Sequence, residues 1–218
     1  MRIKTLNKIN CGFDLDCVLN NLTEVWTQEL NKKYHLHVKY EDIKEWDMSK
    51  AFKTLTKKQI YKPLIKRKIW KHIRPTDGSQ ECLKLLKESG CKVYIITATH
   101  YKNVKWKVNW LKKYFPFMSW DDVIIVKDKS LINVDVLVDD YEANLINGTY
   151  KKLLFNQPWN ENFNEKSNNI IRVHSFDDIS KNILSMTKCK DETDFDCFKC
   201  EYVYDDHGYP CCSKNYAI

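Results

Sequence analysis

Short apolar runs alternate with helical patterns along most of the chain. Strands are predicted at residues 9–14, 92–97, 123–126, 134–138, 152–155 and near 170–173. Helices are predicted at 22–34, 79–89, 103–114, just after Tyr141 and at 176–187. This alternation is typical of an α/β fold with a Rossmann-like, mainly parallel sheet and helices on both faces.

The alternation is interrupted once, after the first strand. Short helical pieces are expected around 41–47 and 50–53, and a longer helix near 56–72 that Thr56 would cap. The pattern predicts a core made of residues 1–20 and 76–187, a helical insertion over 21–75 and a Cys-rich tail over 188–218. A chain of 218 residues is long enough for one core with an insertion.

Composition favours a folded protein without a membrane segment. Hydrophobic residues make up 43% of the chain and aromatic residues 13%, which excludes a disordered chain. The first residues have no apolar signal core, and no later run approaches the length of a membrane span. A soluble, cytoplasmic protein with no membrane partner is the expectation.

The formal net charge of +7 is unevenly distributed. Residues 21–78 carry 14 Lys/Arg and 7 Asp/Glu, whereas residues 188–218 carry 4 and 7. A basic segment beside an acidic site would attract an anionic substrate. The clusters Lys57-Lys58 and Lys66-Arg67-Lys68 could also bind nucleic acid, but a solvated helical face is the commoner explanation. Nucleic-acid binding is therefore not expected.

Two acidic signatures end predicted strands. Asp14-Leu15-Asp16 closes the first strand, and Asp139-Asp140 closes the strand at 134–138. The carboxyl ends of parallel strands share one edge of the sheet, where ligands bind. Clustered carboxylates repel one another unless a hard cation, most often Mg²⁺, neutralises them. Each Asp could instead begin a turn or cap a helix, but two such pairs favour a site.

Thr97 and Lys129 complete a set of groups suited to phosphoryl transfer. One carboxylate can attack phosphorus, and a second, two residues on, can protonate the leaving oxygen and later activate water. A hydroxyl and a Lys can hold the phosphate oxygens, and further carboxylates can hold Mg²⁺. Asp121-Asp122 begins a strand instead of ending one, so no catalytic role is assigned to it.

The order of these groups resembles the haloacid dehalogenase-like (HAD-like) phosphohydrolases. Their motifs are matched by Asp14-x-Asp16, Thr97, Lys129 and Asp139-Asp140. The resemblance implies that Asp14 is the nucleophile, Asp16 the general acid/base, and that Thr97, Ala98 and Lys129 bind phosphate. It also implies that Mg²⁺ is held by the Asp14 carboxylate, the Asp16 backbone carbonyl, Asp139 and Asp140.

Within that superfamily, the chain looks most like the 5′(3′)-deoxyribonucleotidases of the cytosolic and mitochondrial type and their phage and bacterial relatives. Residues 126–140 resemble that family's third and fourth motifs, and residues 155–160 its next strand and loop. The implied activity is Mg²⁺-dependent hydrolysis of a deoxynucleoside monophosphate through an aspartyl-phosphate. The resemblance also implies a homodimer that associates through the cap. One departure is Cys17, where many relatives have Gly.

The insertion is where this superfamily places a helical cap that closes over the site. Its many aromatic residues suggest stacking on a nucleobase, with Trp46 and Phe52 as the preferred candidates and Leu22 and Trp70 beside them. The alternative is that these side chains fill the small core of the cap itself.

The tail contains a cysteine pattern that could bind Zn²⁺. Cys197, Cys200, Cys211 and Cys212 are the expected ligands of a tetrahedral structural zinc, with His207 or Cys189 as substitutes. A metal would explain how a segment with few apolar residues folds. The alternative is a disordered tail.

Rival functions remain. One is a HAD-type phosphatase acting on a sugar phosphate or a polynucleotide end, and another is a non-catalytic nucleotide-binding protein on the same scaffold. A phosphorylation-controlled receiver domain is rejected, because there the acidic pair ends the first strand and the phosphoacceptor follows later.

Overall fold

The computed structural model describes residues 8–186, 203–204 and 210–211. The chain divides into two units, Met1–Thr187 and Lys188–Ile218. In the second unit, β7 (Val203–Tyr204) pairs with β8 (Pro210–Cys211) in antiparallel orientation. Of the expected zinc ligands, Cys197, Cys200 and Cys212 lie outside the described residues, and Cys211 is described only through its backbone. The zinc site therefore stays a prediction.

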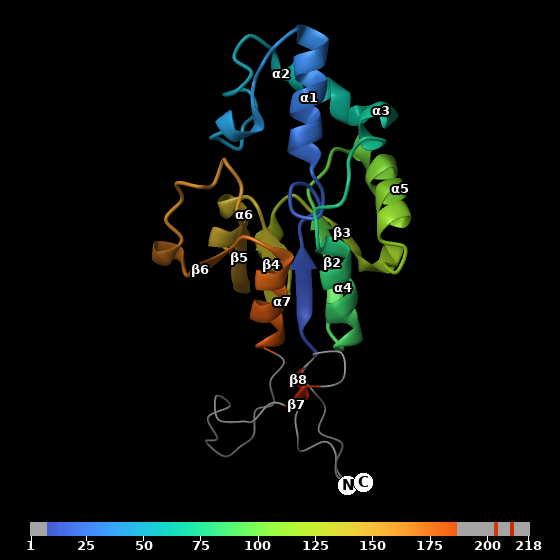
Figure 1. Ribbon diagram of the computed structural model, residues 1–218, viewed down its shortest axis with the longest axis vertical. Helices are drawn as coiled ribbons and strands as arrows, with labels where there is room; N and C mark the ends of the chain where they lie inside the picture. The colour runs from blue at the N-terminus through green and yellow to red at the C-terminus, as the bar shows by residue number, and fades with distance from the viewer. Residues whose placement is uncertain (1–7, 187–202, 205–209, 212–218) are drawn as a thin grey trace. The chain divides into compact units, whose positions relative to one another are not determined.

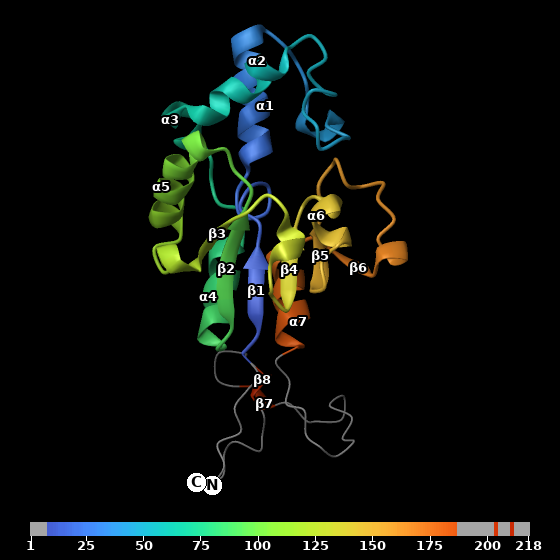
Figure 2. The same cartoon turned by 180° about the vertical axis from the view of Figure 1, so that it is seen from behind.

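A six-stranded sheet organises the first unit (Figures 1 and 2). The strand order is β3-β2-β1-β4-β5-β6, and every neighbouring pair is parallel. The strands are β1 (Asn10–Phe13), β2 (Lys92–Thr97), β3 (Val123–Ile125), β4 (Val136–Asp139), β5 (Lys151–Phe155) and β6 (Ile170–Val173). The predicted α/β, Rossmann-like parallel fold is confirmed.

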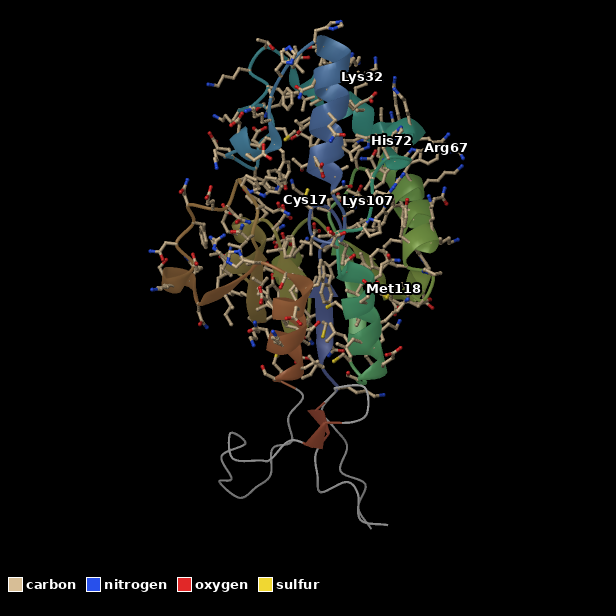
Figure 3. The ribbon with its side chains drawn as sticks, viewed as in Figure 1. Cys17, Lys32, Arg67, His72, Lys107 and Met118 are labelled. Atoms are coloured by element: carbon tan, nitrogen blue, oxygen red, sulfur yellow. The ribbon has the colours of Figure 1, made fainter. Side chains whose placement is uncertain are left out.

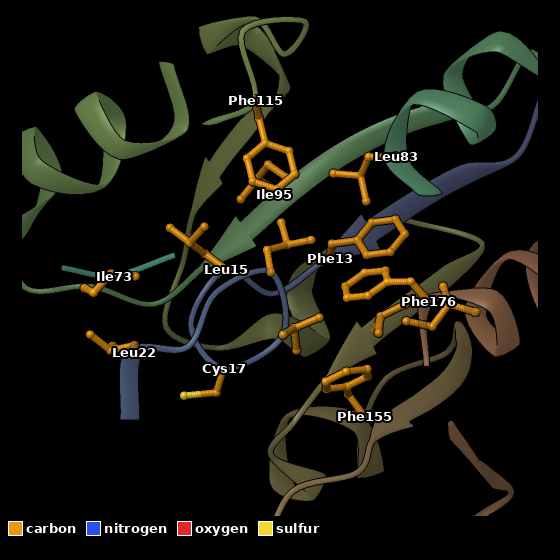
Figure 4. Close-up of a cluster of buried hydrophobic side chains, with 14 of the residues drawn as sticks. Phe13, Leu15, Cys17, Leu22, Ile73, Leu83, Ile95, Phe115, Phe155 and Phe176 are labelled. Atoms are coloured by element: carbon orange, nitrogen blue, oxygen red, sulfur yellow. The ribbon is translucent and has the colours of Figure 1, made fainter. Parts of the chain in front are cut away.

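Helices cover both faces of this sheet. α4 (Ser79–Glu88) and α7 (Phe176–Leu184) pack against each other on one face. Figure 4 shows Phe13, Phe155 and Phe176 gathered in the cluster of apolar side chains beneath them. On the other face, α6 (Glu142–Ile146) packs against β4 and β5, and its Leu145 belongs to a second apolar cluster.

Gly12 in the central strand makes room for close packing on that second face. A Cβ atom there would lie 2.5 Å from Cδ1 of Ile96 and 3.0 Å from Cδ1 of Leu137. A larger residue there would require the Ile96 and Leu137 side chains to shift.

The insertion between β1 and α4 is helical but more broken than its pattern predicted. It contains α1 (Leu22–Tyr34), η1 (Tyr40–Asp42), α2 (Lys57–Tyr61), η2 (Lys62–Ile65) and α3 (Arg67–Trp70). The predicted long helix near 56–72 is wrong in its continuity, because Pro63 has no N–H and its ring disfavours an uninterrupted α-helix. The predicted Thr56 cap is confirmed: its hydroxyl accepts from the Gln59 N–H, and its own N–H donates to the Gln59 side chain.

The two expected short helices are also wrong. Only η1 overlaps the first, and residues 50–53 form turns. The Asp47 carboxylate accepts the Ser49 N–H at 3.0 Å, which favours a turn over the start of a helix at this point.

The remaining helices follow the parallel sheet. They are α5 (Val104–Tyr114) and the 3₁₀ turns η3 (Tyr101–Asn103), η4 (Trp120–Asp122), η5 (Lys129–Leu131) and η6 (Lys166–Asn168). Within the described ranges, no helix combines the length and apolar character that crossing a bilayer would require.

The insertion leaves and rejoins the core at one place. The Asn21 N–H donates to the Arg74 carbonyl at 3.1 Å, and the Thr76 N–H donates to the Leu19 carbonyl at 3.0 Å. Asn20 and Pro75 form an antiparallel bridge between the same two segments. The entry and exit of the insertion are thus hydrogen-bonded neighbours at the carboxyl end of β1.

Candidate active site

A cavity of about 310 Å³ lies between the carboxyl ends of the strands and the insertion. Asp14, Asp16, Lys129 and Asp140 form its polar part. The insertion contributes an apolar wall, which includes Leu22, Trp26, Met48, Leu64 and Trp70. A charged floor under an apolar wall suits a ligand that is anionic at one end and planar and apolar at the other.

Three carboxylates meet where β1 and β4 end side by side. Asp14, Asp139 and Asp140 each present an oxygen within 4.8 Å of the others, and all three are buried. Burial, reinforced by Asp139 and Asp16 and opposed by Lys129, raises the pKa of Asp14 to about 7. Burial, followed by the charges of Asp139 and Asp14, raises the pKa of Asp140 well above its usual range. This concentration of oxygen ligands fits a divalent cation.

Lys129 forms ion pairs with two of the three clustered carboxylates. Its Nζ lies 2.5 Å from Oδ1 of Asp14 and 2.5 Å from Oδ2 of Asp139, and the side chain is 1% exposed. Burial alone would lower the pKa of Lys129, but the two carboxylates outweigh it and raise that pKa. The ammonium therefore stays charged and offsets part of the repulsion among the carboxylates.

Lys107, which the sequence did not single out, lies in the same site. Figure 3 labels it beside Cys17, where the sheet meets the insertion. Its Nζ donates to Oδ2 of Asp16 at 2.6 Å, to the Thr97 hydroxyl at 2.7 Å and to the Ala98 carbonyl at 3.1 Å. It thus connects the second aspartate of the first motif with the threonine motif.

The position of Lys107 in α5 is the signal that could have revealed it. Lys107, Trp110 and Leu111 are all buried on one face of this helix. A lysine within the apolar stripe of an amphipathic helix needs a partner for its buried charge. Asp16 supplies that partner.

The loop after the first motif contains an unusual cysteine. Cys17 has φ +64°, in the left-handed region that favours glycine. The side chains of Asn20 and Gln157 hold this loop: the Cys17 N–H donates to Asn20 Oδ1 at 3.3 Å, and Gln157 Nε2 donates to the Cys17 carbonyl at 2.6 Å. The backbone therefore keeps the shape suited to glycine while carrying a side chain.

Three of the four predicted substrate-binding residues line the cavity: Leu22, Trp46 and Trp70. The fourth prediction is corrected, because Phe52 is 1% exposed and packs in the apolar core instead of lining the cavity. Its short, irregular segment turns the ring inward. Burial of one ring among several could not be read from the sequence.

Trp46 connects the insertion with the core. Its ring stacks on that of Tyr141, the residue after the acidic pair, with centroids 4.5 Å apart and an interplanar angle of 16°. Trp46 is 52% exposed, so one part of its surface remains available at the cavity. The stack thus joins the insertion to the residue that follows Asp140.

Asp122 and two tryptophans of α5 lie outside this chemistry. Asp122 pairs with Lys87 at 3.0 Å at the opposite edge of the sheet. Trp106 and Trp110 donate their indole N–H groups to the carbonyls of Ile65 and Ile73, which fixes α5 to the insertion.

Six parallel strands with Asp-x-Asp after the first, Thr at the end of the second and an acidic pair at the end of β4 define a HAD-like phosphohydrolase. A haloacid dehalogenase-like hydrolase from Streptococcus pneumoniae is similar in structure, with a TM-score of 0.60 at 14% identity over 83% of this chain and 99% of that one. A putative haloacid dehalogenase-like hydrolase from Burkholderia xenovorans gives 0.58 at 14% identity, covering 84% and 99%. At this identity the likeness concerns the fold alone.

The sequence comparisons identify the family within that class. The family model described as 5′ nucleotidase, deoxy (pyrimidine), cytosolic type C protein matches residues 7–189, and the chain belongs to this family. A 5′(3′)-deoxyribonucleotidase from Clostridium acetobutylicum is 35% identical over 159 residues, which is 73% of this chain and 88% of the relative. One from Bacillus subtilis is 31% identical over 175 residues, covering 79% and 97%. The protein is a phosphoric monoester hydrolase of the nucleotidase kind.

Proposed function

We propose that this protein hydrolyses deoxynucleoside monophosphates to deoxynucleoside and phosphate through a phosphorylated Asp14. The observation that carries the proposal is that one cavity is lined both by Asp14, Asp16 and Lys129 and by the apolar wall with its tryptophans. The names of the relatives, 5′(3′)-deoxyribonucleotidases, support the same substrate class.

The acidic cluster fits Mg²⁺. Asp14, Asp139 and Asp140 offer hard oxygen ligands within 4.8 Å of one another, and the Asp16 backbone carbonyl would add a neutral one. Bound there, Mg²⁺ would offset the repulsion between an anionic nucleophile and an anionic phosphate.

Two half-reactions follow from the two aspartates. In the first, a carboxylate oxygen of Asp14 forms a bond to phosphorus, the ester P–O bond breaks, and Asp16 gives its proton to the leaving oxygen. In the second, Asp16 takes a proton from water, the water oxygen bonds to phosphorus, and the Asp14–phosphate bond breaks. Lys129, the Thr97 hydroxyl and the Ala98 N–H supply positive charge and donors for the phosphate oxygens.

The apolar wall is suited to a nucleobase. Trp26 donates its indole N–H to the Ile60 carbonyl and Trp70 donates to the Leu64 carbonyl, so both rings present apolar surface to the cavity. A planar base gains contact area and stacking on such rings, whereas a bare sugar phosphate does not.

Basic segments flank the cavity. None of the residues 48–76 and 98–120 is Asp or Glu, and both segments contain several Lys. The Trp106 N–H donates to the Ile65 carbonyl at 3.3 Å and so joins the two segments. A surface of one sign beside the site attracts a dianionic substrate.

Replacing Lys107 by Gln is expected to lower kcat/KM by about 10–100-fold, because a charged hydrogen bond to Asp16 is lost. The exposed Lys105→Gln variant, on the same helix, should leave kcat/KM nearly unchanged. Steady-state phosphate release measures both variants. Equal activity of Lys107→Gln and the wild type would remove Lys107 from the catalytic arrangement.

Mg²⁺ binding is expected to weaken as the pH falls below about 7. The pKa of Asp14 is raised to about 7, so below that pH its carboxyl is protonated in the folded protein and Mg²⁺ must displace the proton. The dissociation constant measured by calorimetry should rise about fivefold between pH 7 and pH 6. An unchanged constant would show that Asp14 is already ionised at pH 6.

A substrate panel tests the proposed function. Phosphate release is measured from 5′ and 3′ deoxy- and ribonucleoside monophosphates, a sugar phosphate and a 5′-phosphorylated oligonucleotide, with Mg²⁺ and with EDTA. Mg²⁺-dependent turnover of a deoxynucleotide supports the proposal. Preferred turnover of the sugar phosphate or the oligonucleotide would replace the substrate class, and nucleotide binding without any turnover would indicate a binding protein.

A further inference from the structure

Asn103 carries an unpaired carboxamide in the wall of the active-site cavity. The residue is 7% exposed and lines the cavity together with Lys107. Its Oδ1 is buried without a hydrogen-bond partner, and its Nδ2 donates to no group in the described part of the chain. Leaving a buried polar group unpaired destabilises a fold. A bound ligand that pairs with the carboxamide would explain why Asn103 stands at this position.

Helix capping does not explain the asparagine at position 103. Asn103 immediately precedes α5, where an asparagine side chain ordinarily accepts an N–H of the first helical turn. Here the side chain makes no such hydrogen bond. Its carboxamide is therefore left for the cavity.

The place of Asn103 along the cavity indicates which part of a nucleotide it would meet. Lys107, one helical turn further on and about 6 Å along the axis, carries the ammonium that contacts Asp16. η3, the turn that Asn103 ends, packs against η2 of the insertion, and Leu64 of η2 lines the same cavity. Asn103 thus has a charged group one helical turn away and the apolar wall beside it, and in a nucleotide the sugar lies between phosphate and base.

The chemistry of the carboxamide selects a hydroxyl. A carboxamide accepts through Oδ1 and donates through Nδ2, which complements a hydroxyl that both donates and accepts. An ionised phosphate only accepts, and would leave Oδ1 unpaired. We propose that Asn103 binds the free 3′-hydroxyl of the deoxyribose of a 5′-monophosphate substrate, an inference that rests on the proposed function.

The test removes the hydroxyl and the carboxamide separately and together. The nucleotide turned over fastest and its 3′-deoxy analogue are compared on the wild type and on Asn103→Leu, which keeps the approximate shape of the side chain. The wild type should prefer the hydroxylated substrate by about 10–100-fold in kcat/KM, because the analogue leaves the carboxamide unpaired. In Asn103→Leu this ratio should fall close to one.

A matched control separates this role from a structural one. Thr27 also has a buried, unpaired side-chain oxygen, but it does not line the cavity. Thr27→Val and Asn103→Leu should both keep or raise Tm, since each removes an unpaired polar group, and only Asn103→Leu should change the substrate ratio.

The outcomes distinguish this inference from the function on which it rests. If the wild type hydrolyses nucleotides but Asn103→Leu keeps the wild-type ratio, or the wild type shows no preference, the role of Asn103 is overturned and the nucleotidase stands. If the wild type hydrolyses only non-nucleotide esters, the proposed function fails and the hydroxyl contact fails with it.

Discussion

Asp14→Asn is expected to reduce phosphate release by about 10⁴-fold or more, the largest effect of any substitution in this chain. An amide has the shape of the carboxylate but cannot form the bond to phosphorus. Asp14 is buried directly after β1, where Lys129 holds its carboxylate. The measurement is phosphate release from the preferred nucleotide with saturating Mg²⁺, with single-turnover acid quench to detect phosphorylated protein.

Asp121→Asn is the matched control. It makes the same change in the acidic pair at the opposite edge of the sheet, and activity should stay at the wild-type level. Both variants should remain folded, because Asp14→Asn removes one of three clustered negative charges. If the wild type forms no phosphorylated protein in a single turnover while Asp14→Asn stays active, Asp14 is not the nucleophile.

Lys129→Met is expected to produce the largest loss of stability. Lys129 is the cation between Asp14 and Asp139, and removing it leaves buried carboxylates without their counter-charge. Removing one partner of a buried ion pair lowers the free energy of unfolding by about 3–5 kcal/mol. Urea unfolding in EDTA at pH 8 measures this loss. Mg²⁺ should restore more stability to Lys129→Met than to the wild type, because it supplies the missing positive charge.

Lys68→Met is the control for that measurement. Lys68 pairs with Glu29 at 3.1 Å, but its side chain is 64% exposed, so its loss should cost less than about 1 kcal/mol. Equal destabilisation by the two substitutions would mean that the Lys129 contacts add nothing beyond a surface pair. Activity of Lys129→Met should also fall, since the phosphate oxygens lose a cation.

The sheet could be predicted because its signal is local. Strands buried on both faces, such as β2 and β4, appear as short β-branched runs, and the motif residues Thr97 and Asp139 end them. Because neighbouring strands are parallel, Asp14, Thr97 and Asp139 meet at one edge of the sheet, and this does not depend on which side chains fill the core.

The insertion was harder to predict because its packing is tertiary. Pro63 breaks the periodic segment that looked like one helix, and Phe52 turns inward where the irregular backbone allows it. Lys107 was overlooked for a related reason. Lysines are so common on helix surfaces that one lysine within an apolar stripe is a weak signal, and its partner Asp16 lies 91 residues away in the sequence.

The neighbouring entry and exit of the insertion have an evolutionary consequence. The Asn21 N–H donates to the Arg74 carbonyl and the Thr76 N–H to the Leu19 carbonyl. These hydrogen bonds keep the two ends of the insertion together whatever lies between them. Residues can be added, lost or exchanged there without shifting the register of β1 against β2 or β4. A lineage can therefore change which molecules it accepts by remodelling this one segment, while the groups that break the phosphate ester remain untouched.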